Sequence, residues 1–146
     1  MSTSTPATVS APSNIAFIKY WGAQNLKRAI PVNPSISMTL DRCRSRCTAR
    51  FVEGAGDHTI LLRDAGGTFQ PAPPAFADRI RAHLKRLTSW ADVRGHFHIA
   101  TENTFPAAAG IASSASGFAA LTLAVLAALD RRDLSMPERS NLARLS

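Results

Sequence analysis

The sequence has no long hydrophobic run, no leader peptide pattern and neither of the two common nucleotide-binding fingerprints. Its longest apolar stretch, residues 118–129, is interrupted by Thr122 and is shorter than a membrane span requires. The N-terminal segment MSTSTPATVSAPS lacks both the basic start and the apolar centre of a signal peptide. Neither Gly-x-x-x-x-Gly-Lys-Ser/Thr nor Gly-x-Gly-x-x-Gly occurs. We therefore expect a cytoplasmic protein with no membrane anchor, and no common nucleotide fingerprint identifies its ligand.

Cysteines are also few, and their spacing excludes a disulfide. If Cys43 and Cys47 lie on extended chain, their Cα atoms are about 13 Å apart, which is too far for a bridge. No nearby histidine or cysteine completes a metal site around them. We expect two reduced, structural thiols, in agreement with a reducing compartment.

Acidic residues are outnumbered, ten against seventeen basic ones, and the net charge is +7. Such an excess is compatible with nucleic acid, an anionic surface or a phosphorylated substrate. The fourteen arginines are scattered, however, and no pattern of stacking aromatics accompanies them. We interpret most of them as solvated surface, whereas Lys19 attracts attention because its neighbours are apolar.

The 146 residues, 45% of them hydrophobic, are enough for one modest domain with a true core, and their patterns predict an α+β fold. Extended chain is expected at residues 8–22, with an interruption at Ala-Pro-Ser-Asn. Alternating polar and apolar residues predict further strands at residues 35–40, 47–53, 58–63 and 95–103. The Gly54-Ala55-Gly56 turn predicts a hairpin between the strands at 47–53 and 58–63.

Two helices are predicted. Prolines at 71, 73 and 74 end an extended segment and start a helix over residues 75–90, in which Phe76, Ile80, Leu84 and Leu87 form one apolar stripe. A second helix is expected from about residue 113 to 129. On the last strand, His96 and His98 form a His-x-His pair that is able to bind a metal, but we interpret them as the wet face of the strand.

The stretch FPAAAGIASSASGFAAL, residues 105–121, starts this second helix with residues of almost no bulk or charge. A strand, a loop of small residues and a helix N-terminus together form an arrangement that holds phosphate, because free backbone N–H groups and the helix dipole both favour an anion there. Ser113, Ser114 and Ser116 add hydroxyls. An N-cap serine with tightly packed alanines explains the pattern equally well, so both readings stay open on the residues alone.

Three motifs carry a resemblance to a known family. The segment PAAAGIASSASG resembles the second, ATP-phosphate-binding motif of the GHMP kinase superfamily, in the variant of mevalonate diphosphate decarboxylases. APSNIAFIKYWG, residues 11–22, and IPVNPSISMTL, residues 30–40, are similar to the N-terminal signature of those enzymes. The resemblance implies a GHMP-kinase-like N-terminal domain with a left-handed β-α-β unit. It also implies an isoprenoid-pathway enzyme that uses ATP and Mg²⁺ to phosphorylate a tertiary 3-hydroxyl, after which phosphate and carbon dioxide leave together.

The resemblance also implies a role for individual residues. Lys19 matches a catalytic lysine near the transferring phosphate, and Tyr20, Trp21, Gly22 and Ala23 match the stretch that contacts the phosphorylated end of the substrate. Ser114 matches a serine that helps bind ATP and its magnesium. The expected ATP-binding residues are Ala107, Ala108, Ala109, Gly110, Ile111, Ala112, Ser113, Ser114 and Ser116.

Two departures bear on the substrate. Many relatives have a lysine where this chain has Ala23, and Phe76 aligns with an arginine that binds the diphosphate in relatives. Two missing cations favour a substrate with less charge, so mevalonate 5-phosphate is a candidate beside mevalonate 5-diphosphate. Arg79, Arg81 or residues beyond position 146 are able to supply the missing charge instead.

The third departure is length, because relatives run to roughly 300 residues or more, a two-domain size. The expected catalytic aspartate and a substrate-binding arginine have no counterpart in the matching motifs. We expect residues 1–146 to be an incomplete N-terminal domain, without the C-terminal domain and inactive alone. The resemblance leaves homodimerisation open. Two alternatives remain: a mevalonate 3-hydroxyl kinase that does not decarboxylate, and a small basic RNA-binding module. We expect no nucleic-acid partner.

Overall fold

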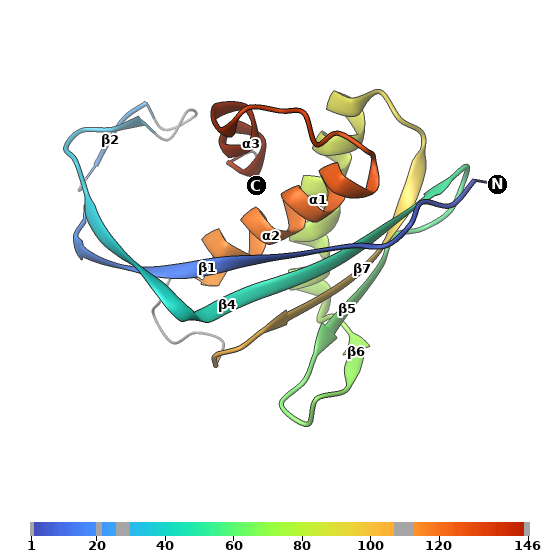
Figure 1. The fold of residues 1–146 in the computed structure, drawn as a ribbon, viewed down its shortest axis with the longest axis horizontal. Coiled ribbons are helices and arrows are strands. Elements are labelled where there is room, and N and C mark those ends of the chain that lie inside the picture. The colour runs from blue at the N-terminus through green and yellow to red at the C-terminus, as the bar shows by residue number, and fades with distance from the viewer. Residues whose placement is uncertain (1, 20–21, 26–29, 107–112, 145–146) are drawn as a thin grey trace.

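The computed structural model describes residues 2–19, 22–25, 30–106 and 113–144, which form a sheet with helices packed on one face (Figure 1). Five strands lie in the order β1-β4-β7-β5-β6, and β2 and β3 form a separate two-stranded ribbon. The strands are β1 (Ala7–Ile18), β2 (Ala23–Asn25), β3 (Ile30–Pro31), β4 (Ile36–Glu53), β5 (Thr59–Arg63), β6 (Phe69–Pro71) and β7 (Gly95–Asn103). The helices are α1 (Pro74–Ala91), α2 (Ser113–Ala128) and α3 (Met136–Ala143). The predicted α+β class is confirmed.

The core lies between the sheet and the helices, with α2 at its centre. Phe97 and Ile99 of β7 are 0% and 1% exposed, because alternate residues of a strand face the same side of a sheet. Leu84 and Leu87 contribute the matching stripe of α1. Helix α2 is apolar around most of its circumference, which suits a helix that contacts β1, β4 and β7 on one side and α3 on another.

The two strands expected at 35–40 and 47–53 are one continuous strand, β4, which bends around a bulge. Pro12 of β1 pairs with Arg44, but Ser13 pairs with Leu40, so residues 41–43 are extra on β4. Proline has no N–H to donate to the ladder and is found at such irregularities. The bulge coincides with the interruption predicted in the first strand.

The predicted hairpin between residues 47–53 and 58–63 is wrong. Strand β7 lies between β4 and β5, antiparallel to the first and parallel to the second. Both edges of β7 are therefore paired, and its apolar residues Phe97 and Ile99 are buried. The turn at residues 54–56 therefore leads past β7 rather than back along β4, and α1 covers the crossover from β5 to β7.

The helices begin and end much as their sequences predict. Pro74 occupies the first turn of α1, and Asp92 ends it in the left-handed conformation with φ 53°. Of the predicted apolar stripe, Ile80, Leu84 and Leu87 are buried, but Phe76 is 38% exposed. Helix α3, which was not predicted, starts with a capping box between Ser135 and Glu138. The backbone N–H and the hydroxyl of Ser135 both donate to the carboxylate of Glu138. No helix in the described part of the chain is long and apolar enough to cross a membrane.

Candidate active site

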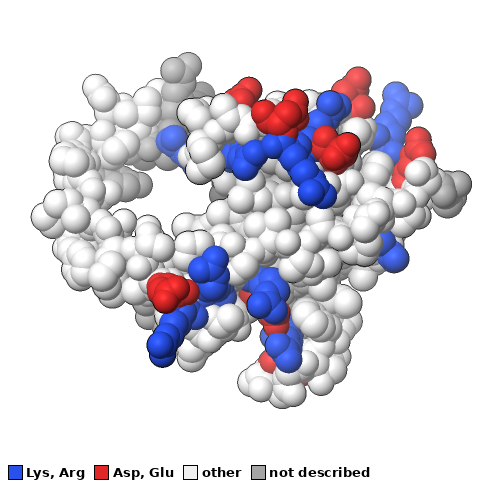
Figure 2. All heavy atoms as spheres, in the orientation of Figure 1, with Lys and Arg blue, Asp and Glu red and all other residues white. Residues whose placement is uncertain are grey.

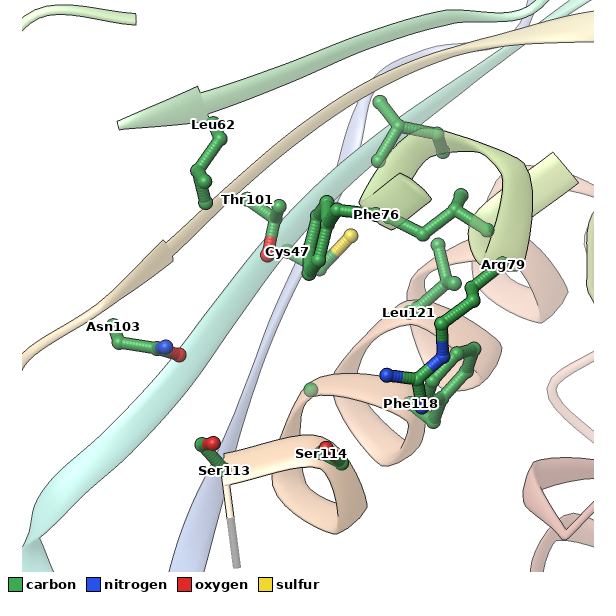
Figure 3. Close-up of a pocket in the computed structure, with 13 residues that line it drawn as sticks. Cys47, Leu62, Phe76, Arg79, Thr101, Asn103, Ser113, Ser114, Phe118 and Leu121 are labelled. Atoms are coloured by element: carbon green, nitrogen blue, oxygen red, sulfur yellow. The ribbon is translucent and has the colours of Figure 1, made fainter. Parts of the chain in front are cut away.

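A cavity of about 240 Å³ opens between α1, the start of α2 and strands β4, β5 and β7 (Figure 3). Its walls are mostly apolar. Ser113 and Ser114 lie at the start of α2, Thr101 lies beside Cys47, and Arg79 extends from α1 toward Phe118. The apolar lining consists of Cys47, Leu62, Phe76, Ile80, Ile99, Phe118 and Leu121. The polar lining consists of Arg79, Thr101, Asn103, Ser113 and Ser114. An apolar pocket with a few convergent polar groups is the usual form of a small-molecule site.

The first turn of α2 presents a positive field to this cavity. Ser113 is half-buried and Ser114 is exposed, and both line the cavity. No acidic residue lies in the first turn of the helix to offset the partial positive charge of its free N–H groups. This end of α2 is therefore suited to a phosphate, and the exposed Ser114 hydroxyl is a hard oxygen ligand of the kind that magnesium accepts.

Ser116 has a different role from the two serines before it. It is 4% exposed, and its Oγ lies 2.8 Å from Oγ of Ser45 on β4, whose hydroxyl donates to Oδ1 of Asn103 at 2.7 Å. This buried network fastens the start of α2 to β4 and β7. Because the hydroxyl of Ser116 is engaged inside the protein, we place Ser116 outside the phosphate-binding surface.

Thr104, directly after β7, joins the segment before α2 to the bulge of β4. Its Oγ1 donates to the carbonyl of Arg42 at 2.7 Å and accepts from the N–H of Arg44 at 2.9 Å. Its own N–H donates to the carbonyl of Arg44 at 2.9 Å. One side chain thus satisfies a carbonyl and an N–H of the bulge, and these bonds hold the chain that leaves β7 against β4.

Helices α1 and α2 are held together beside the cavity by polar contacts. Nε2 of the fully buried His83 lies 2.8 Å from Oγ1 of Thr122, which donates to the carbonyl of Phe118. The rings of His83 and Phe118 meet edge to face with centroids 5.1 Å apart. The guanidinium of Arg79 lies over the Phe118 ring, 5.4 Å from its centroid.

The predicted substrate-binding residues lie elsewhere. Lys19 follows β1, is exposed, and donates from Nζ to the carbonyl of Ala16 at 3.4 Å. Gly22 has φ +82° and accepts a backbone hydrogen bond from Val32, so a conformation that favours glycine starts the β2–β3 ribbon. Ala23 pairs with Pro31 in that ribbon.

The structure does not bring together Ala23 and Phe76, the two positions that carry a cation in relatives. Ala23 is in the ribbon at one end of the molecule, whereas Phe76 is on α1 in the wall of the cavity (Figures 1 and 3). Phe76 therefore belongs with the α2 cavity and not with Lys19. The predicted site residues Tyr20, Trp21 and the whole loop from 107 to 112 lie outside the described residues.

The cysteines and the histidine pair agree with structural roles. Both thiols are free, and burial raises the pKa of Cys47 to about 12. His96 and His98 are half-buried, with ring centroids 5.6 Å apart. Within the described ranges, no three side chains of His, Cys, Asp or Glu gather as a metal site.

Some residues of the site were not identified from the sequence. Arg79 was named only as an alternative source of charge at the phosphorylated end of the substrate, whereas the structure places it in the α2 cavity. Asn103, Thr104 and Phe118 carried no functional prediction. Phe118 carried one available signal: it is four residues after Ser114, so on a helix it shares the face of that serine.

Comparisons with known proteins give a consistent result. Residues 11–146 match the family model of the diphosphomevalonate decarboxylase-like N-terminal domain. The diphosphomevalonate decarboxylase of Ganoderma lucidum is 40% identical, covering 94% of this chain and 36% of its own length. That of Saccharomyces cerevisiae is 36% identical, covering 94% and 37%. The chain thus spans less than half the length of these curated relatives.

Solved structures of mevalonate diphosphate decarboxylases superimpose closely on this chain. Mevalonate diphosphate decarboxylase from Staphylococcus aureus has a TM-score of 0.83 and 32% identity over 99% of this chain and 41% of its own. The enzyme from Enterococcus faecalis has a TM-score of 0.81 and 33% identity over 99% and 43%. A structure in complex with MVAPP, AMPPCP and magnesium has a TM-score of 0.80 and 33% identity over 99% and 42%.

Proposed function

Because the chain belongs to the diphosphomevalonate decarboxylase-like family, as an N-terminal domain, we propose that its protein catalyses ATP-dependent decarboxylation of a 5-phosphorylated mevalonate in isoprenoid biosynthesis. One observation carries the proposal: an apolar cavity that leads to the first turn of α2, with Ser113 and Ser114 at the junction. The matching structure with AMPPCP and magnesium supports ATP and Mg²⁺ as the cofactors.

Nucleotide and metal divide between the parts of this site. The apolar end of the cavity takes the base, and the loop from 107 to 112 and the first turn of α2 take the phosphates. Ser114 supplies a hydroxyl to the magnesium that accompanies them, since this side chain is exposed at the helix start. Ser113 is the second hydroxyl at the same turn.

Lys19 supplies positive charge to the reacting groups. Phosphoryl transfer depends mainly on positioning and charge neutralisation. Among the residues that the structure describes, the Lys19 ammonium makes one long hydrogen bond, to the carbonyl of Ala16, which leaves donors for an anionic substrate. Tyr20, Trp21, Gly22 and Ala23 contact the phosphorylated end of that substrate. The expected aspartate and arginine have no counterpart in the matching motifs, so we propose that residues 1–146 do not turn over alone.

The test is a product assay with the full-length protein. We expect carbon dioxide and inorganic phosphate to be released in equal amounts, only when ATP, magnesium and a 5-phosphorylated mevalonate are all present. A phosphorylated mevalonate formed without carbon dioxide would instead identify a 3-hydroxyl kinase. Binding of RNA that weakens steeply with salt and ignores ATP would identify the RNA-binding alternative. The face shown in Figure 2 does not support the RNA-binding alternative, because its basic side chains are separated and several lie beside acidic ones.

We further propose that the full-length protein prefers mevalonate 5-phosphate to the 5-diphosphate, or discriminates only weakly against the 5-phosphate. The support is Ala23, because position 23 of the ribbon lacks the lysine that many relatives have there. Phe76 lies in the wall of the α2 cavity and does not support this proposal.

The prediction is tested by changing Ala23 to lysine. The ratio of kcat/KM for the 5-diphosphate to that for the 5-phosphate should rise roughly tenfold, because one charge-assisted contact is gained on the longer anion. Gln24→Lys, on the neighbouring exposed position of the same ribbon, is the matched control. A strong preference for the diphosphate before any substitution would overturn this proposal and leave the decarboxylase assignment in place.

A further inference from the structure

Arg79 is the only basic side chain that lines the α2 cavity among the residues that the structure describes. Its guanidinium lies 5.4 Å from the centre of the Phe118 ring. Within the described ranges, its guanidinium makes no hydrogen bond or ion pair, whereas Arg46, Arg63 and Arg81 do. Arg81, two residues later, bonds Asp78 at 2.7 Å, and Arg46 and Arg63 both bond Glu102 on the sheet.

The position of Arg79 is set by α2. Phe118 is four residues after Ser114, so the two side chains lie one turn apart on one face of the helix. A guanidinium over Phe118 therefore lies about one helical turn from Ser114, and both residues line the cavity (Figure 3). The His83–Thr122 contact holds α1 against α2 at this level, and this fixes the distance between the two faces.

From this geometry we propose that Arg79 binds the phosphate chain of the nucleotide, a role that rests on the proposed function. A nucleoside triphosphate brings several negative charges into the cavity, and the helix start offers only a partial positive charge to meet them. The guanidinium has five N–H donors in a planar fork that matches phosphate oxygens, and none of them has an internal partner in the described structure.

Stacking on Phe118 also makes this arginine ready to bind. The ring restrains a long side chain before the ligand arrives, so less rotational freedom is lost when the phosphate is bound. Phe76, one turn earlier on α1, lines the same cavity with an apolar ring. Successive turns of α1 thus present an apolar group and then a cation, in the order of base and phosphates along a nucleotide.

The experiment measures equilibrium binding of ATP, ADP and adenosine to the full-length protein. Arg79→Met keeps the stem that covers Phe118 but removes the charge. Its affinity for ATP should fall roughly tenfold to a hundredfold, its affinity for ADP should fall too, and its affinity for adenosine should stay within about twofold. Arg79→Lys should recover part of the ATP affinity, since charge returns without the fork. Arg81→Met, whose arginine is paired with Asp78, is the control and should bind ATP normally.

Phe118→Leu tests the link between ring and cation. It should lower the affinity for ATP relative to adenosine, and this effect should vanish in the Arg79→Met background, because the ring acts on ATP through the arginine. Equal losses of ATP and adenosine affinity in Arg79→Met would mean that the side chain only supports the cavity wall and would overturn the proposal, as would an unchanged ATP affinity. If the unsubstituted protein binds no ATP, the proposed function itself fails.

Discussion

Lys19 and Arg79 are both exposed basic side chains with few internal partners, but they lie in different parts of the molecule. Lys19 follows β1 at the end near the β2–β3 ribbon, and Arg79 lies in the α1–α2 cavity. At the scale of single residues, the structure therefore separates the two cations that our proposals assign to the substrate and to the nucleotide.

For Lys19, substitution by methionine should lower kcat by roughly a hundredfold to a thousandfold while KM changes by less than about fivefold. The reason is that neutralising the transferring phosphate matters most in the transition state. Lys85→Met, on the exposed face of α1, should leave both constants unchanged. Normal turnover per folded molecule, together with a large loss of stability, would contradict a catalytic role.

At the scale of elements, α2 is both the centre of the core and one wall of the site. Its serines divide between the two tasks, because residues two apart on a helix do not share a face. Ser116 is buried against Ser45, and Ser114 is exposed at the cavity.

Alanine substitutions at these two serines should therefore affect different properties, stability for Ser116 and ATP binding for Ser114. Ser116→Ala should lower the free energy of unfolding by about 1 kcal/mol and leave the affinity for ATP unchanged. Ser114→Ala should leave stability unchanged and weaken ATP binding by roughly threefold to tenfold. Denaturant unfolding and equilibrium nucleotide binding measure the two quantities, and the same pattern in both variants would refute the division.

The junction of β5 and β7 makes stability depend on pH. Burial, then the neighbouring His96 and Arg81, lowers the pKa of His58, and burial with Arg50 and His96 lowers the pKa of His98. Nδ1 of His58 also accepts a hydrogen bond from the backbone N–H of Phe97 at 3.0 Å, which the protonated ring cannot do. The folded state thus favours both neutral rings.

The sign of the effect follows from proton binding. Below the ordinary histidine pKa of 6.5, the unfolded chain takes up protons that the folded chain resists. The free energy of unfolding should be highest above that pH and should decrease as the pH falls from 7 to 5. Replacing both His58 and His98 by glutamine should flatten this dependence, because the amide oxygen still accepts a hydrogen bond but does not titrate. An equal slope in the double variant would show that other groups are responsible.

At the scale of the whole molecule, the sheet and its helices enclose one continuous core, and Cys47 lies inside it. The thiol is 0% exposed, and its pKa of about 12 leaves roughly one molecule in ten thousand as thiolate at pH 8. Because Cys47 is also part of the wall of the α2 cavity, its reactivity reports the opening of that wall or of the core behind it.

In a Cys43→Ser variant, iodoacetamide should modify Cys47 only at the rate at which the protein opens. Denaturant should accelerate the modification. Saturating ATP should slow it, because ATP bound in the α2 cavity covers the wall that contains Cys47 and also stabilises the folded state. Mass spectrometry of quenched samples measures the modified fraction. Modification at the rate of a free thiol without denaturant would contradict the burial of Cys47.

Much of the architecture follows from local pattern. Pro74 and the stripe of Ile80, Leu84 and Leu87 determine α1, and alternation determines β7. The motifs at 11–22, 30–40 and 106–117 identify the family, because they require no knowledge of distant neighbours.

Only the tertiary structure decided which segments became neighbours. Strand β7 separates β4 from β5, and the Ser45–Ser116 contact joins residues 71 positions apart. The selection of Arg79 from fourteen arginines depends on Phe118, 39 residues later, being packed beside it. Periodicity records which face of an element is apolar, but not which other face will cover it. That choice depends on the joint packing of all elements around one core, and so the cavity and its cation became visible only in the folded chain.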